Sequence, residues 1–125
     1  MMTLFYVGLG GALGSMARFG VGVMLKTTST LGFPWASLSV NLLGSLAMGL
    51  VMGWLSRVGP YEGLRLFLAV GLLGGFTTFS AFSMELFGLL ERREAFLAVV
   101  YASSSVVGGV AVFCLGYALV RSVLA

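Results

Sequence analysis

Residues 71–83 of this chain read Gly71-Leu72-Leu73-Gly74-Gly75-Phe76-Thr77-Thr78-Phe79-Ser80-Ala81-Phe82-Ser83. The stretch lies inside a hydrophobic block long enough to cross a bilayer, yet it carries glycines, hydroxyls and phenylalanines where a plain spanning helix has leucine, isoleucine and valine. Backbone at membrane depth must satisfy its own polar groups unless it faces protein or a water-filled cavity. The stretch therefore predicts an interrupted helix and a candidate site for small ions.

The composition is that of an integral membrane protein. Of 125 residues, 59% are hydrophobic and only 9% are charged, whereas soluble domains average about 25% charged residues. The net charge is +3, but the cations are scattered and form no basic patch for nucleic acid. The chain has no histidine, no paired carboxylates and no nucleophile beside a base, so the sequence does not predict an enzyme.

Four hydrophobic blocks predict a single all-α membrane domain over residues 1–125, with the third helix interrupted. The blocks cover residues 4–25, 34–56, 64–90 and 95–120. Pro34 is expected in the first turn of the second helix, where its missing N–H costs nothing. The first block contains Arg18 and lacks a basic leader, so it is interpreted as a retained span and not as a signal peptide.

Apart from Arg18, which lies inside the first block and leans toward the side of Lys26, the positive charges divide equally between the two sides of the membrane, which leaves the orientation almost undecided. Membrane proteins normally carry an excess of Lys and Arg on the cytoplasmic side. Either chance explains the balance in a chain with few charges, or the chain inserts both ways and pairs as an antiparallel dimer. One side has Arg57, Arg65 and Arg121, and the other has Lys26, Arg92 and Arg93.

Glycines at four-residue spacing allow helices to approach closely in lipid, either within one chain or between subunits. The pairs are Gly10 and Gly14, Gly49 and Gly53, and Gly71 and Gly75.

Several polar side chains fall at membrane depth, and each has a structural and a functional interpretation. Arg18 either reaches toward the interface or provides a fixed positive charge at a vestibule. Asn41 either joins two helices by hydrogen bonds or offers its NH₂ group to an anion. Glu85, the only acid well inside a block, either ends a polar track or is held by a cation such as Arg18.

Aromatic and hydroxyl side chains recur at helical spacing in the third and fourth blocks. Phe76, Phe79 and Phe82 are three residues apart, so they are expected on one helix face, either as core and lipid contacts or with their positive ring edges toward an anion. Tyr101 and Ser105 are four residues apart on one helix face, where either the serine bonds to a carbonyl of its own helix or the face forms a track of donors.

Three segments together resemble the Fluc (CrcB) family of fluoride channels, in order and spacing along the whole chain. The third segment is the most specific, because its Thr-Thr-Phe-Ser-x-Phe-Ser core is rare in a membrane span. The segments are residues 10–19 (GGALGSMARF), residues 41–45 (NLLGS) and residues 74–85 (GGFTTFSAFSME).

This resemblance implies a fluoride-selective channel of the inner (plasma) membrane, which exports cytoplasmic fluoride by passive flux through the pores of an antiparallel homodimer. Its expected partners are fluoride, a second copy of the chain and the lipid bilayer. The resemblance places Arg18 at a vestibule, and it places a structural sodium ion at the dimer interface on carbonyls of Gly74 and Thr77. It assigns the pore to Asn41, Phe79, Ser80, Phe82, Ser83, Tyr101 and Ser105.

Two positions depart from the family pattern, and two other functions remain as alternatives. Ala81 replaces the usual threonine between the phenylalanines, and Phe19 replaces a frequent tyrosine. A small dual-topology, proton-coupled drug antiporter would need an acid in the first span, where this chain has Arg18. A purely structural membrane subunit would be expected to have plain apolar spans. The segment at residues 74–83 carries glycines and hydroxyls and does not fit that expectation.

Overall fold

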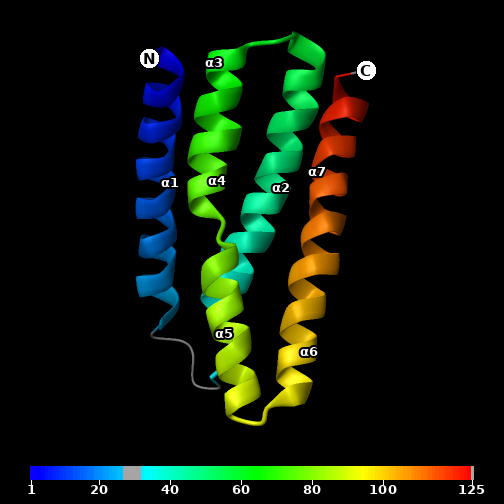
Figure 1. Cartoon of the computed structure of the whole chain (residues 1–125). Helices are drawn as coiled ribbons and strands as arrows, with labels where there is room; N and C mark the ends of the chain where they lie inside the picture. The colour runs from blue at the N-terminus through cyan, green and yellow to red at the C-terminus, as the bar shows by residue number, and fades with distance from the viewer. Residues whose placement is uncertain (27–31, 125) are drawn as a thin grey trace.

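The computed structural model describes residues 1–26 and 32–124, and all the regular structure in these ranges is helical. Within them, four segments are long and apolar enough to cross a membrane, as the sequence predicts. They run antiparallel to their neighbours along the chain, so both termini lie at the same end of the bundle (Figure 1). The four segments are Met2–Leu25, Trp35–Val58, Glu62–Glu91 and Ala95–Val123.

The first two segments are continuous helices, α1 (Met2–Lys26) and α2 (Trp35–Val58). The predicted connection between them includes residues 27–31, which lie outside the described residues. Pro34 is the residue before α2 and not part of its first turn, because its ψ of 63° is not helical. The helix therefore begins one residue later than expected.

The third and fourth segments are each built from several helical pieces. The third contains α3 (Glu62–Arg65), the π-helical η1 (Leu66–Leu73), α4 (Gly74–Phe76) and α5 (Phe79–Glu91). The fourth contains α6 (Ala95–Ser103), the π-helical η2 (Ser104–Gly108) and α7 (Gly109–Val123). Wide π turns inside α-helices are rare and often occur at functional sites.

In the half of the bundle that contains the termini, the helices pack closely against one another at glycines. A Cβ on Gly14 of α1 would collide with the backbone carbonyl of Leu72 in η1, and a Cβ on Gly49 of α2 would collide with that of Phe113 in α7. In both places the bare glycine lets two backbones touch, which is how small residues stabilise helix contacts in lipid. These glycines therefore serve packing within the chain.

A cluster of buried side chains lies in the other half, between α5, α6 and the start of α2. Its residues are Phe33, Leu38, Phe82, Leu89, Ala98 and Tyr101. Many large apolar side chains remain exposed along the whole bundle, among them Phe5, Phe96 and Val123. Such a surface needs lipid or another protein chain around it.

Arginines at both ends of the bundle form hydrogen bonds and ion pairs with loops and helix ends. At the end with the termini, Arg57 donates to the carbonyl of Arg121, and Arg65 pairs with Glu62 at 2.8 Å. At the opposite end, Arg92 pairs with Glu94 at 3.2 Å and also donates to the carbonyl of Gly32.

Candidate functional site

The site is organised by a two-residue gap in helical backbone at Thr77 and Thr78. Both residues are extended, with ψ angles of 157° and 124°. The N–H and hydroxyl of Thr77 both donate to the carbonyl of Leu73, at 3.0 and 2.9 Å, and so close the end of α4. The hydroxyl oxygen of Thr78 accepts from the N–H of Ala81 at 3.2 Å and caps α5. The two threonines thus end one helix and begin the next.

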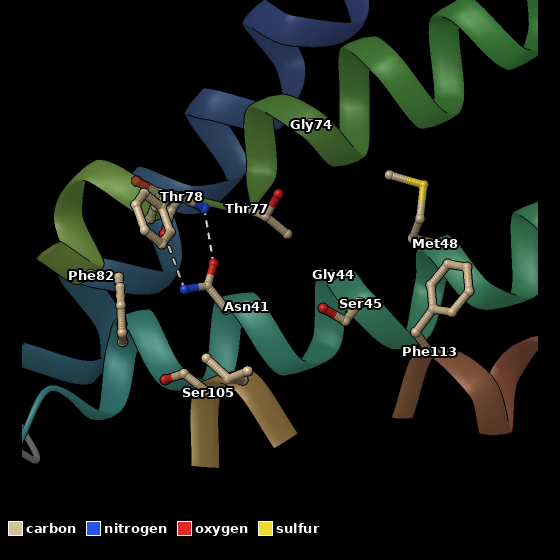
Figure 2. A pocket seen from close by; sticks show the side chains of 12 residues that line it. Asn41, Gly44, Ser45, Met48, Gly74, Thr77, Thr78, Phe82, Ser105 and Phe113 are labelled. Atoms are coloured by element: carbon tan, nitrogen blue, oxygen red, sulfur yellow. Dashed lines mark hydrogen bonds between the residues drawn. The ribbon is translucent and has the colours of Figure 1, made fainter. Parts of the chain in front are cut away.

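Asn41 of α2 forms hydrogen bonds to the backbone of the gap from across the bundle. Its Oδ1 accepts from the N–H of Thr78 at 2.8 Å, and its Nδ2 donates to the carbonyl of the same residue at 3.1 Å (Figure 2). An unbroken helix would have satisfied these backbone groups itself, and leaving them unpaired at membrane depth is costly. Nδ2 carries two hydrogens, so one remains for another acceptor.

A cavity of about 490 Å³ lies beside this gap. The structure brings six of the residues proposed from sequence together on its wall: Asn41, Gly74, Thr77, Phe79, Phe82 and Ser105. The Oγ of Ser105 is buried and has no hydrogen-bond partner among the described residues. The cavity wall therefore combines apolar rings with neutral donors.

Phe79 and Phe82, which both line the cavity, differ in exposure. Phe82 is 8% exposed and Phe79 is 77% exposed, while their ring centroids lie 5.6 Å apart. The expectation that Phe76 shares their helix face is wrong, because the extended residues Thr77 and Thr78 separate α4 from α5. The ring of Phe76 lies instead near Gly44 of α2.

Tyr101 links the rings to the partly buried acid Glu85. Its side chain is 0% exposed, its ring centroid lies 5.1 Å from that of Phe82, and its hydroxyl donates to Glu85 at 2.7 Å. The hydroxyl of Ser37 donates to the other carboxyl oxygen of Glu85 at 2.8 Å. Glu85 is thus held by two neutral hydroxyls.

Arg18 and Glu85 line a second cavity of about 370 Å³ on the other side of the gap. Arg18 does not pair with Glu85 in the part of the chain that the structure describes. Its Nε donates instead to the carbonyl of Gly75 at 3.2 Å, at the carboxyl end of α4. A cation there complements the negative end of the helix dipole and also gives this cavity a positive wall.

Ser80 and Ser83 lie outside both cavities in the single chain. Ser80 shares a hydrogen bond of 3.4 Å with the hydroxyl of Thr78. Ser83 is exposed and donates to the carbonyl of Phe79 at 3.0 Å within its own helix. Their assignment to the pore therefore stays a prediction that depends on what covers this face of α5.

Sequence reasoning did not select Ser37, Ser45 or Thr78 for the site, and it left the partner of Glu85 open. Ser37 and Ser45 each lie four residues from Asn41, which places all three on one face of α2. That spacing could have indicated that the two serines lie on the same side of α2 as Asn41. The partner of Thr78 was not readable, because it lies 37 residues away in the chain.

The chemistry of the site favours an anion on the donors and a hard cation on the carbonyls. No group of three or more His, Cys, Asp or Glu residues that could hold a metal occurs among the described residues. The N–H of Thr78 bonds to Asn41, so the carbonyl of Gly74 lacks the donor that an unbroken helix would supply. Free carbonyls at a broken membrane helix are typical cation ligands.

Fold and site together define a small multi-pass α-helical membrane protein with a donor-lined cavity at a gap between helices. The family model described as CrcB-like protein, Camphor Resistance (CrcB), matches residues 5–117. The chain belongs to this CrcB family, which confirms the resemblance found in the sequence.

Similar proteins cover almost the whole chain. The fluoride-specific ion channel FluC of Sphingopyxis alaskensis is 50% identical over 122 residues, which are 97% of each chain. That of Novosphingobium aromaticivorans is 46% identical over 127 residues, 98% of this chain and 99% of the relative. That of one Thermus thermophilus strain is 49% identical over 120 residues, 95% of each.

Proposed function

We propose that this protein is a fluoride-selective channel through which cytoplasmic fluoride leaves the cell passively across the plasma membrane. The observation that carries the proposal is the cavity at the gap, where Asn41 and Ser105 present neutral donors beside Phe79 and Phe82. The names of the relatives support the same ion. The role is ion transport and not catalysis.

The donors and rings suit a small anion that gives up its water. Fluoride is strongly hydrated, so a pore must replace its water with other donors, as carbonyls replace water for cations. The amide of Asn41 and the hydroxyl of Ser105 supply such donors without a fixed charge that would hold the ion too tightly. The positive edges of the Phe79 and Phe82 rings add weak attraction. The positive wall at Arg18 would raise the concentration of anions near one cavity mouth.

We also infer that the active form is an antiparallel homodimer, in which the gap interrupts the third span of each copy. Phe79 and Ser83 are exposed in a single chain, and a second copy would enclose them. The equal division of cations between the two ends removes the usual bias for one orientation.

Cysteine labelling in intact cells tests this orientation. In a Cys114→Ala background, a membrane-impermeant maleimide should label about half of the chains that carry Tyr61→Cys, and about half of those that carry Glu91→Cys, since neither substitution changes the balance of Lys and Arg. These positions lie at opposite ends of the bundle (Figure 1). Complete labelling at one position with none at the other would show a single orientation.

A structural sodium ion fits the carbonyl side of the gap. The carbonyl of Gly74 has lost its helical donor to Asn41, while those of Leu73 and Gly75 are taken by Thr77 and Arg18. Gly74 and Thr77 would hold the ion through backbone oxygen, which suits a hard cation. Sodium would supply positive charge that screens the carbonyls of two chains from one another.

Replacing sodium by N-methylglucamine tests this ion through stability as well as flux. The thermal midpoint of the purified protein should fall and should return when sodium is restored, because an ion that binds only the folded state stabilises it. A thermal midpoint that is independent of sodium would contradict the proposal.

Fluoride efflux from reconstituted vesicles tests the main function. Vesicles loaded with potassium fluoride should release it when valinomycin carries the balancing potassium, and protein-free vesicles should not. Release should not require a proton gradient, whereas a proton-coupled antiporter would depend on one. A folded protein that leaves fluoride trapped would overturn the proposal.

A further inference from the structure

Ser45 lies one helical turn after Asn41 on α2 and lines the same cavity (Figure 2). It also lines an adjoining cavity of about 360 Å³, which extends toward α7. Ser45 and Ser105 are the two hydroxyl-bearing residues common to both cavities. Ser45 therefore lies where the space beside Asn41 continues along the bundle.

The hydroxyl of Ser45 is available to a ligand. Serines in membrane helices usually bond to a carbonyl of their own helix, as Ser83, Ser104 and Ser122 do here. No protein group in the described ranges bonds to the hydroxyl of Ser45. The hydroxyl of Ser105 is likewise without a partner and is buried.

The fourth span supplies no donor at the level of Ser45. One turn after Ser105 comes Gly109, which has no side chain, and one turn further comes the apolar ring of Phe113. A Cβ built on Gly109 would lie 3.5 Å from the Oγ of Ser45. The hydroxyl of Ser45 thus faces the space that a side chain at position 109 would enter.

We propose that Ser45 is a further fluoride-binding residue. The ion would bind first to Asn41 and Ser105 and then to the hydroxyl of Ser45, so that the next donor along the path comes from α2 and not from the fourth span. This inference rests on the proposed function. The hydroxyl donates its hydrogen to fluoride, and no covalent bond changes. Without Ser45, an ion leaving Ser105 toward α7 would meet Gly109 and Phe113, which offer no side-chain donor.

The matched pair Ser45→Thr and Ser45→Val tests the hydroxyl, because the two side chains have nearly the same shape. Fluoride efflux should stay within about twofold of the parent for threonine and fall about tenfold for valine, since a hydrogen bond to a charged group is lost. Ser122→Ala, far from both cavities and bonded to its own helix, serves as the control and should leave efflux unchanged.

A rescue experiment separates ion binding from packing. In the background of Ser45→Ala, the second substitution Gly109→Ser places a new hydroxyl near the position of the lost one, and efflux should recover most of the loss. Equal efflux for the threonine and valine variants, or a loss that Gly109→Ser does not repair, would overturn the inference. If the parent protein itself passes no fluoride, the proposed function fails and not merely this assignment.

Discussion

The two halves of the bundle are built on opposite principles. In the half with the termini, Gly14 and Gly49 bring backbone against backbone and leave no room for a side chain. In the half around the gap, the side chain of Asn41 bonds to Thr78 and the hydroxyl of Tyr101 bonds to Glu85, and two cavities open beside them. Substitutions in the first half should therefore act on stability, and substitutions in the second half should act mainly on ion flux.

The largest effect on stability is expected for Gly14→Ala. Its Cβ would meet backbone atoms of η1 and α4, which cannot move aside as a flexible side chain could. Overpacking of this kind costs about 1–3 kcal/mol and sometimes more. Gly8→Ala is the matched control on the same helix, because nothing lies within 4 Å of its Cβ. Thermal unfolding in detergent measures both, and equal stability would contradict the proposed packing role.

The largest effect on flux is expected for Asn41→Asp. The carboxylate can still accept from the N–H of Thr78, but it brings oxygen against the carbonyl that Nδ2 now serves, and it adds negative charge beside the anion path. Because the new negative charge repels the anion, efflux should fall tenfold or more, which corresponds to about 1.4 kcal/mol or more. Efflux close to the parent rate, measured with a fluoride electrode, would show that Asn41 is not part of the path.

Phe79→Ile should reduce flux strongly while leaving stability nearly unchanged. Phe79 is 77% exposed in the single chain, so it contributes little to the core, but isoleucine lacks the ring edge proposed to attract fluoride. Phe87→Ile on the same helix is the control, because Phe87 is 61% exposed and lines neither cavity at the gap. Similar efflux from both variants would show that the ring of Phe79 does not contribute to fluoride permeation.

A smaller effect is expected for Tyr101→Phe. The substitution keeps the ring beside Phe82 but removes the hydroxyl that donates to Glu85, leaving Ser37 as its remaining hydroxyl donor. We expect efflux to fall severalfold, less than for Asn41→Asp, because no new charge enters the cavity. Tyr117→Phe, which lies in α7 away from the gap, should not change efflux. A Tyr101→Phe protein with parental efflux would limit Glu85 and Tyr101 to a packing role.

The sequence predicted the four spans closely, because apolar blocks of sufficient length end at charged or turn-forming residues. It also indicated residues 71–83 as unusual, because hydroxyls at membrane depth need partners. It could not place those partners, since Asn41 and Thr78 are 37 residues apart, and the one donor named for Glu85, Arg18, bonds to Gly75 instead. The shared face expected for Phe76 failed because helical spacing does not apply across an extended gap. Ser45 was overlooked because an isolated serine in a helix usually bonds to its own backbone.

Comparing fluoride and chloride efflux from the same reconstituted protein tests the central claim most directly, namely that neutral donors and ring edges around the gap replace the water of a small halide. Vesicles loaded with equal concentrations of the two potassium salts, and released with valinomycin, should lose fluoride rapidly and retain chloride at the level of protein-free vesicles. Chloride efflux as fast as fluoride efflux would contradict the claim, because the site would then be a wide, water-filled passage.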